Sequence, residues 1–440
     1  MISTKSITKT CIVPKLKAIF GSVVHTRRLR VLNSIVLTIL LLSAFTKLVP
    51  TQKLMAVKTF TTPVTIEIGD TSLPPHMISW LKDQIAEFES RYPNITVKTG
   101  DLGGRLGTSI RPYDEQIRNI DQLAGNVIAV QGGYDDELGY LTSNDLIIPV
   151  DNFIANSSVD VNAYPDTFWE GIRSDGSTWG VPFRADAIWL FCDWPLFQEA
   201  GLNKLPETWD EVIEFARILT IDSDGDGIPE QPGLCIPPSK GYRTILLKTL
   251  NIQDGVSYLQ DGVLSFDQPQ IRANFELIRN ISHSGLTYEE TITKIDFTGK
   301  NGVRPAMMLM NNNIPITSTY TEFAQNCLSN PNYLIAPIPD TELGYSPGIS
   351  LYLAVRPGTP EEEYASFRLI EWLTRKDVPL PDFWFGAPYR VDLPEQPGFE
   401  KWSQKFGPNH GVFIDIAARS RQADVQFSGM TYRRTMPVME

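Results

Sequence analysis

Three aspartates within five residues form the clearest chemical motif of this 440-residue chain, a candidate metal-binding loop. In Asp222-Ser223-Asp224-Gly225-Asp226-Gly227-Ile228-Pro229-Glu230, carboxylates occupy positions 1, 3 and 5 of a loop and glycine occupies position 6, as in a calcium-binding turn. The Ile228 carbonyl and the Glu230 carboxylate are placed to add further ligands, whereas Gly233 stands where a bidentate glutamate is usual. The motif predicts a structural Ca²⁺ site, and the alternative is a solvated acidic turn.

Signatures of enzymatic catalysis are missing from the sequence. It holds no H-E-x-x-H, G-x-S-x-G, Walker A or G-x-G-x-x-G pattern, and its four histidines are scattered. A sequence does not show whether two carboxylates lie close together in space, as glycoside hydrolysis requires, so a hydrolase stays an alternative. The residue types favour a binding protein that requires no cofactor.

The charge is divided unevenly along the chain. The sequence has 51 acidic and 39 basic residues, a net charge of −12. Residues 1–50 hold eight of the basic residues and none of the acidic ones, so the remainder carries 31 basic against 51 acidic residues, a net charge of −20. Because a body this acidic repels phosphate backbones, the composition argues against nucleic acid as a partner.

The N-terminal segment predicts membrane targeting. Arg27-Arg28-Leu29-Arg30 precedes an apolar run from Val31 to Phe45. Positive charge before an apolar stretch holds that end in the cytoplasm and sends the downstream part of the chain across the membrane. Residues 1–50 are therefore expected to act as a cleaved signal peptide or a retained anchor, with the body in the periplasm or on the outer face of the cytoplasmic membrane. Three cysteines lie downstream of this segment, so either one disulfide forms or the thiols stay buried and free.

Hydrophobic periodicity predicts alternating strands and helices. Residues 64–70, 95–97 and 127–130 have strand patterns, and Tyr113–Leu123 has a helical one. A helix opening at Pro74-Pro75 presents an apolar face, and Thr208 with Glu211 forms a capping box for a second helix. The two buried stripes are Ile78, Leu81, Ile85, Phe88 and Tyr92, and Val212, Phe215, Ala216 and Leu219. This alternation indicates α/β domains with mostly parallel sheets.

Several blocks of residues, in order, resemble a known family. They are Trp179-Gly180-Val181-Pro182-Phe183-Arg184-Ala185-Asp186, Pro206-Glu207-Thr208-Trp209-Asp210-Glu211, Ala306-Met307-Met308-Leu309-Met310-Asn311, and Leu353-Ala354-Val355 with Pro357-Gly358. In order and spacing, over about residues 62–440, the chain resembles the extracellular solute-binding proteins of family 1, the sugar-binding proteins of ABC importers.

The resemblance implies a type II-like periplasmic-binding-protein fold, in which two α/β lobes hold the ligand in a cleft between them. Lobe one is then expected to comprise residues 60–183 and 350–380, and lobe two residues 184–349 and 381–440. The resemblance also implies closing helices after Thr435-Met436-Pro437, so the chain is expected to be shorter than the family pattern.

Sugar recognition needs aromatic faces for the apolar side of a pyranose ring and planar polar groups for its hydroxyls. The resemblance places suitable residues near the cleft. They are Asp70, Tyr134, Asp186, Trp189, Asn311, Asn312, Ser350, Trp384 and Arg390. The alternative is that Trp189 and Trp384 are core residues and that Asp70 is a turn residue.

The sequence therefore predicts an exported, monomeric, non-enzymatic protein that captures a carbohydrate for the transmembrane subunits of an ABC permease. A ligand that contacts both lobes stabilises their closed arrangement through its differential affinity. Two alternatives stay open, a membrane-anchored ligand sensor of the same fold and a glycoside hydrolase.

Overall fold

The computed structural model describes the chain from residue 62 to residue 421 with gaps. The described ranges are 62–69, 75–100, 125–131, 135–236, 246–247, 249–251, 253–256, 259–260, 263–283, 287–288, 303–311, 330–339, 346–380 and 390–421. The targeting segment and the helix expected at 113–123 lie outside these ranges. Among the described helices, none combines the length and the apolar character needed to cross a membrane.

The described elements alternate between helices and strands. In chain order they are β1 (Val64–Gly69), α2 (Pro75–Arg91), β2 (Ile95–Thr99), β3 (Val127–Gln131), α4 (Asp135–Ser143), α5 (Asp151–Ala155), η2 (Val161–Ala163), α6 (Asp166–Glu170), β4 (Arg173–Ser174), β5 (Ser177–Thr178), β6 (Val181–Asp193), α7 (Trp194–Glu199), α8 (Trp209–Leu219), β7 (Leu234–Cys235), β8 (Leu259–Gln260), β9 (Val263–Leu264), α10 (Pro269–His283), β10 (Thr287–Tyr288), β11 (Met307–Asn311), β12 (Tyr333–Pro337), β13 (Ser346–Val355), α12 (Pro360–Leu373), η4 (Leu393–Glu395), α13 (Phe399–Phe406), η5 (Gly407–Asn409), α14 (His410–Arg419) and β14 (Ser420–Arg421).

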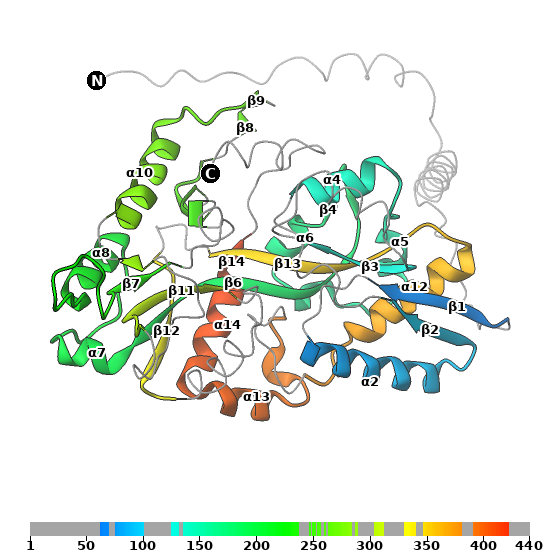
Figure 1. Ribbon diagram of the computed structural model, residues 1–440. Coiled ribbons are helices and arrows are strands. Elements are labelled where there is room, and N and C mark those ends of the chain that lie inside the picture. The colour runs from blue at the N-terminus through cyan, green and yellow to red at the C-terminus, as the bar shows by residue number, and fades with distance from the viewer. Residues whose placement is uncertain are drawn as a thin grey trace, which may run out of the picture. The chain divides into compact units, whose positions relative to one another are not determined.

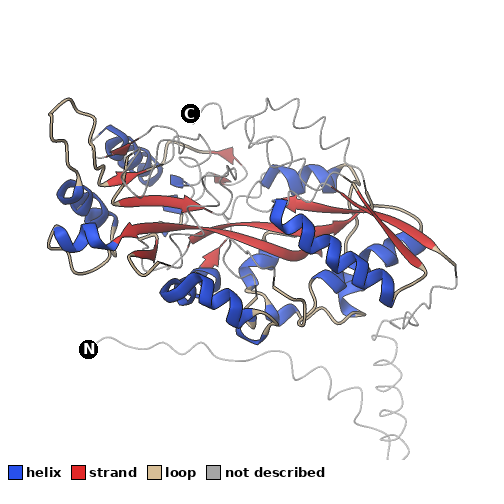
Figure 2. Ribbon diagram, turned by 60° about the horizontal axis from the view of Figure 1, so that its bottom comes forward, coloured by secondary structure: helices blue, strands red, loops and turns tan. Residues whose placement is uncertain are grey.

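Ten strands pair in the order β10-β7-β11-β6-β13-β3-β1-β2, with β12 also paired to β6 and β14 to β13 (Figure 1). Helices lie on both faces of these strands (Figure 2). Strands β1, β2 and β3 are parallel, as are β7, β10 and β11. The expectation of mostly parallel sheets holds for these two groups and for the short pair of β13 with β14. Strands β6 and β13 run antiparallel to each other, β13 runs antiparallel to β3, and β6 runs antiparallel to β11 and β12.

Strand β6 belongs to two sets of partners. Its first half, Val181–Ala187, pairs with β13, and its second half, Ile188–Asp193, pairs with β11 and β12. Strand β13 in turn pairs with β3 through Leu351–Val355. The two long strands therefore connect one lobe, built on β1–β3, with a second lobe, built on β7 and β10–β12. This is the two-lobed α/β arrangement that the sequence predicts.

The core of lobe one lies under α2 and α12. Strand β3 is buried along Val127–Val130, which explains why its sequence is a continuous apolar run rather than an alternating one. The α2 stripe predicted from periodicity faces the core, with Leu81, Ile85 and Phe88 almost completely buried. The Trp372 indole of α12 donates to the Gln84 carbonyl of α2 at 3.0 Å, so the two helices are joined by a bond as well as by packing.

Two helix N-termini show how local residues begin these elements. The Thr208 hydroxyl accepts the Glu211 amide at 3.1 Å, as predicted, but the Glu211 carboxylate accepts from the Glu207 amide and the Lys204 ammonium instead of the Thr208 amide. The reciprocal capping box is found at α12, where Thr359 and Glu362 exchange both bonds. Lys204 is therefore a competing partner that the Thr-x-x-Glu spacing does not reveal.

Two cysteines lie in the core of lobe two. Cys192 and Cys235 are buried on β6 and β7 and form no disulfide, which matches the alternative of buried thiols for this pair. Burial raises the pKa of the Cys235 thiol to about 12, so the reactive thiolate is scarce at neutral pH.

Ser366 provides a test of the α12 interface. Its hydroxyl is fully buried, and no group in the described part of the chain bonds to it. Because an unpaired buried hydroxyl is costly and alanine favours helix, Ser366→Ala should raise the unfolding free energy by about 1–2 kcal/mol. Urea midpoints measure the change.

The matched control is Ser158→Ala, because the Ser158 hydroxyl donates to the buried Glu371 carboxylate at 2.6 Å. This variant should lower the urea midpoint. Equal effects of the two substitutions would contradict the assignment of Ser366 as an unpaired group.

Candidate functional site

The carboxyl ends of three parallel strands meet at one edge of the lobe-one sheet. Strand β1 lies between β2 and β3, and Ile68 is opposite both Thr99 and Val127. Gly125 has a φ of +105°, and a Cβ atom there would lie 3.0 Å from the Glu67 carbonyl oxygen, so only glycine fits beside β1. Ligands of open α/β sheets bind beyond such carboxyl ends. Two predicted residues, Asp70 and Tyr134, come after β1 and β3 in sequence and lie outside the described residues.

Backbone pairing brings three further predicted residues together where the chain crosses between the lobes. On β6, Ala185 is opposite Ser350, Asp186 is opposite Ile349, and Ile188 is opposite Asn311. The register thus holds Asp186, Ser350 and Asn311, which are far apart in sequence, within a few residues of one another across adjacent strands. For these three residues the structure describes the backbone alone. Asn312 and Trp384 lie outside the described residues, so all five stay predictions as ligand contacts.

Trp189 comes after this crossing on β6. It is opposite Met310 of β11 and Pro337 of β12, and 1% of its surface is exposed. A strand with neighbours on both sides buries its large side chains in the lobe, so the burial supports the core alternative for Trp189. A ligand contact for this residue remains a prediction.

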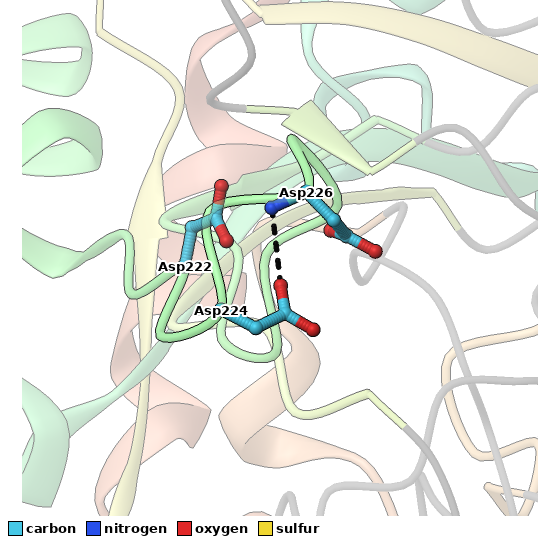
Figure 3. Close-up of side chains that lie close together, drawn as sticks. All are labelled: Asp222, Asp224 and Asp226. Carbon is cyan, nitrogen blue, oxygen red and sulfur yellow. Dashed lines mark hydrogen bonds between the residues drawn. The ribbon is translucent and has the colours of Figure 1, made fainter.

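The acidic loop between α8 and β7 brings its three aspartates together (Figure 3). Each of Asp222, Asp224 and Asp226 offers a carboxylate oxygen, and these oxygens all lie within 4.8 Å of one another. The backbone folds around them, because Asp222 accepts the Gly225 and Gly227 amides at 2.8 and 3.0 Å and Asp224 accepts the Asp226 amide at 3.1 Å. This geometry fits a hard cation with oxygen ligands.

The other two predicted metal ligands take different positions. The Ile228 amide donates to the Asp226 carboxylate at 2.8 Å, and the Ile228 side chain is exposed. The Glu230 carboxylate accepts the Ser223 amide at 2.7 Å, and this bond lowers its pKa. Glu230 thus bonds to the loop backbone at Ser223 and is not one of the three clustered carboxylates.

Gly233 explains why this loop lacks the glutamate at position 12. A Cβ atom at Gly233 would lie 2.0 Å from the Ala216 carbonyl oxygen of α8, so no side chain fits there. The Gly233 amide donates to the Thr220 hydroxyl at 3.0 Å, and a bridge between Ile221 and Gln231 closes the base of the loop. The loop therefore differs from an EF-hand, and any cation must be held without a bidentate ligand at position 12.

Arg390, predicted near the cleft, has its guanidinium engaged by protein groups. Its side chain is 2% exposed and forms a two-bond fork with Asp392, at 2.7 Å for each bond. A third nitrogen donates to the Thr374 carbonyl at 2.9 Å, and the guanidinium lies 5.2 Å from the centre of the Tyr164 ring. These contacts fix residues 390–392 to the end of α12 and to the segment after η2. A ligand contact for Arg390 remains a prediction.

Sequence reasoning missed the partners of Arg390. Tyr164 lies 226 residues away and Thr374 contributes a backbone carbonyl, so neither leaves a pattern in the sequence. Asp392, two residues along, was the only local signal of an arginine fork.

The Arg390 fork should make folding stability depend on pH. Burial raises the pKa of Asp392, but the hydrogen bonds and positive charge of Arg390 outweigh burial and hold this pKa below its ordinary value. The fork therefore stabilises the fold above the ordinary carboxyl range and is lost as the pH falls through the lowered pKa. Asp392→Asn should cost about 3–5 kcal/mol at neutral pH, because it removes the negative charge that compensates the buried Arg390 guanidinium.

The measurement is the unfolding free energy of wild type and Asp392→Asn from pH 7 downward, and their difference should shrink as the medium becomes acidic. Glu395→Gln is the control, because its pair with Lys376 is exposed on both sides. A difference that does not depend on pH would contradict the fork as its origin.

Comparison with known proteins agrees with the outline given by the geometry. Residues 74–271 match the family of bacterial extracellular solute-binding proteins. YcjN of Escherichia coli K12, assigned to the periplasmic-binding proteins of ABC transporters, is 23% identical over 251 residues, which are 56% of this chain and 55% of YcjN. The chain thus matches about half the length of this curated relative.

Solved structures share the fold over most of the chain. The sugar-binding protein MalE from Xanthomonas citri superposes with a TM-score of 0.64 at 18% identity, covering 86% of this chain and 90% of MalE. UgpB from Mycobacterium tuberculosis, in complex with glycerophosphocholine, has a TM-score of 0.61 at 15% identity, covering 86% and 96%. A chitin oligosaccharide binding protein has a TM-score of 0.62 at 12% identity, covering 85% and 92%. With its crossing strands and its two lobes, the chain is similar in fold to these binding proteins, and its residues 74–271 match the family of bacterial extracellular solute-binding proteins.

Proposed function

We propose that this protein captures a carbohydrate and delivers it to the transmembrane subunits of an ABC permease. The observation that carries the proposal is the register of β6, β13 and β11, which gathers Asp186, Ser350 and Asn311 at the crossing between the lobes. Asp70 and Tyr134 come after strands whose carboxyl ends face the same region of the sheet.

The chemistry of these residues suits a neutral polyol. Carboxylate, amide and hydroxyl groups accept and donate the hydrogen bonds that sugar hydroxyls require, and tyrosine supplies a flat apolar face. The body of the chain has a net charge of −20 outside residues 1–50, which disfavours the approach of anions. The names of MalE and the chitin oligosaccharide binding protein point to saccharides, while UgpB holds a glycerophosphodiester. A neutral saccharide is thus favoured over a phosphodiester.

Binding without chemical conversion agrees with the same comparison. The family and its structural neighbours are binding proteins, and the sequence carries no catalytic signature. Export is proposed to depend on the apolar run at residues 31–45, with the body acting as a monomer outside the cytoplasmic membrane. A glycoside hydrolase and a sensor without a permease are the alternatives.

The first test is a thermal-shift screen of the purified protein. Maltotriose, chitotriose, raffinose and monosaccharides form the panel, with glycerophosphocholine and a dipeptide as other ligand classes. A saccharide at 100 times its Kd should add about 2.7 kcal/mol to stability. Asp186→Ala should weaken binding of that saccharide by about 1–3 kcal/mol, and Asp83→Ala, an exposed aspartate of α2, should leave it unchanged.

Chromatography of the saccharides after incubation separates binding from hydrolysis. Intact saccharides support the proposal, and cleavage products would favour the hydrolase. If glycerophosphocholine or the dipeptide raises the melting temperature and no saccharide does, the ligand belongs to that other class and the saccharide proposal is wrong.

We also propose that the loop from Asp222 to Glu230 binds Ca²⁺ for structural purposes. Its support is the cluster of three carboxylate oxygens within 4.8 Å, since like charges this close repel one another unless a cation neutralises them. The affinity should be weak, on the order of 10⁻⁴ M as in extracellular modules, because Gly233 leaves no room for a bidentate ligand.

Chelation tests the calcium proposal. EDTA should lower the melting temperature of wild type, Asp224→Ala should remove that sensitivity, and the saccharide affinity of this variant should stay within a few-fold. Asp83→Ala is the control and should respond to EDTA like wild type. If wild type shows no calorimetric Ca²⁺ uptake at millimolar concentration and no response to EDTA, the loop is a solvated acidic turn.

A further inference from the structure

Gln396 is a buried amide without a side-chain hydrogen-bond partner among the described residues. Its side chain is 4% exposed, and neither its oxygen nor its nitrogen bonds to any group in that part of the chain. Its backbone, by contrast, is fully used, because its amide donates to the Leu393 carbonyl at 3.0 Å and its carbonyl accepts the Phe399 amide at 3.1 Å. Burying an amide in this way costs about 1–3 kcal/mol. Such groups are rare in native proteins and call for a specific reason.

The position of Gln396 in the fold suggests that reason. Residues 390–409 form a third connection between the lobes, beside β6 and β13. At its start the bond from the Arg390 guanidinium to the Thr374 carbonyl, at 2.9 Å, and the bond from the Val391 amide to the Ala163 carbonyl, at 2.8 Å, fix it to lobe one. At its end the Asn409 side chain accepts the Ile335 amide at 2.9 Å and donates to the Tyr333 carbonyl at 3.1 Å, which fixes it to β12 of lobe two.

Gln396 lies between these two anchors, at the junction of η4 and α13. Gly398, two residues further, has a φ of +87°, which favours glycine and gives the chain a sharp change of direction. The Pro397 carbonyl accepts the Leu380 amide at 3.1 Å, so the junction also touches the segment after α12. A change in the angle between the lobes moves one anchor relative to the other, and the junction in the middle must absorb it.

We propose that Gln396 is a positioning residue for ligand capture, whose amide finds its hydrogen-bond partners in the saccharide-bound arrangement of the lobes. In the arrangement that the structure shows, the unpaired amide raises the free energy. Pairing in the saccharide-bound arrangement removes that penalty. The residue thus biases the lobes toward the binding-competent arrangement, which raises the apparent affinity. This inference rests on the proposed capture function and adds a residue that does not touch the saccharide.

The test replaces Gln396 with methionine, which keeps the length of the side chain and removes both polar atoms. Without saccharide, Gln396→Met should raise the melting temperature, because the unpaired amide is gone. With the member of the maltotriose, chitotriose and raffinose panel that wild type binds, calorimetry should show affinity reduced about tenfold, equivalent to about 1.4 kcal/mol. Gln396→Leu provides a second apolar replacement if the methionine variant folds poorly.

Ser366→Ala is the matched control. It also removes an unpaired buried polar group from lobe one, but Ser366 lies in α12 and outside the connection. It should raise the melting temperature and leave saccharide affinity unchanged, so stabilisation alone does not account for a loss of affinity.

Several outcomes would overturn the inference. A lower melting temperature of Gln396→Met would show that the amide is bonded in the resting protein, for example through a buried water. Equal or higher saccharide affinity of the variant would show that the bound arrangement has no added use for the amide. If wild type binds no saccharide of the panel, the proposed function and this inference are both overturned. If wild type binds a saccharide and Gln396→Met binds it with the same affinity, the inference alone is overturned.

Discussion

The backbone pairing of β6 with β13 is the constraint on which the candidate site depends. Strand β6 pairs with β11 and β12 of lobe two, strand β13 pairs with β3 of lobe one, and the ladder between β6 and β13 joins the two lobes. The same ladder sets which residues stand at the crossing. A slip of one residue would reverse the face of every side chain beyond it. It would also separate Asp186 from the Ile349–Ser350 pair and Ile188 from Asn311. One set of backbone hydrogen bonds therefore specifies both the connection between the lobes and the positions of the candidate residues.

Elements whose signals are local could be predicted from the sequence. The β1, β2 and β3 strands, the α2 stripe and the α8 stripe are recognisable from periodicity over short windows, and all of them are found at or near the expected residues. Family resemblance supplied the two lobes, which periodicity does not reveal. The capping box at Thr359 has the same Thr-x-x-Glu spacing as the one expected at Thr208. Both hydrogen bonds of the box form at Thr359, whereas at Thr208 only the bond to the threonine hydroxyl forms. Lys204 makes the difference, and its approach to Glu211 depends on the path of the preceding loop.

Features that depend on distant contacts could not be predicted. In the sequence, Gly233 stands where a metal-binding glutamate is usual. The structure shows that only glycine fits there, because a side chain would collide with the Ala216 carbonyl of α8. Arg390 is predicted as a ligand contact near the cleft, and its fork with Asp392, its bond to the carbonyl of Thr374 after α12 and its contact with the Tyr164 ring are seen only in the structure. Glu371 is buried beside Arg368, its ion-pair partner on the same helix, and it also accepts two hydrogen bonds from Ser158, 213 residues away, which no local pattern reveals. Burial of a charge is decided by partners that only the tertiary fold assembles.

Among the described residues, the three connections between the lobes differ in how they can bend. The ladder between β6 and β13 is interrupted at one place, where Leu351 is opposite Arg184 and Tyr352 is opposite Pro182, so Phe183 has no counterpart in this described ladder. Proline has no amide hydrogen to donate, and a bulge is where an inner strand tolerates it. On the lobe-one side of this bulge, Tyr352 is held by its hydroxyl, which donates to the Phe168 carbonyl at 2.7 Å. The third connection, residues 390–409, consists of helical turns and loops and is fixed by side chains at its two ends. Bending of the paired strands is thus concentrated at the bulge, and the third connection must accommodate that bending between Arg390 and Asn409.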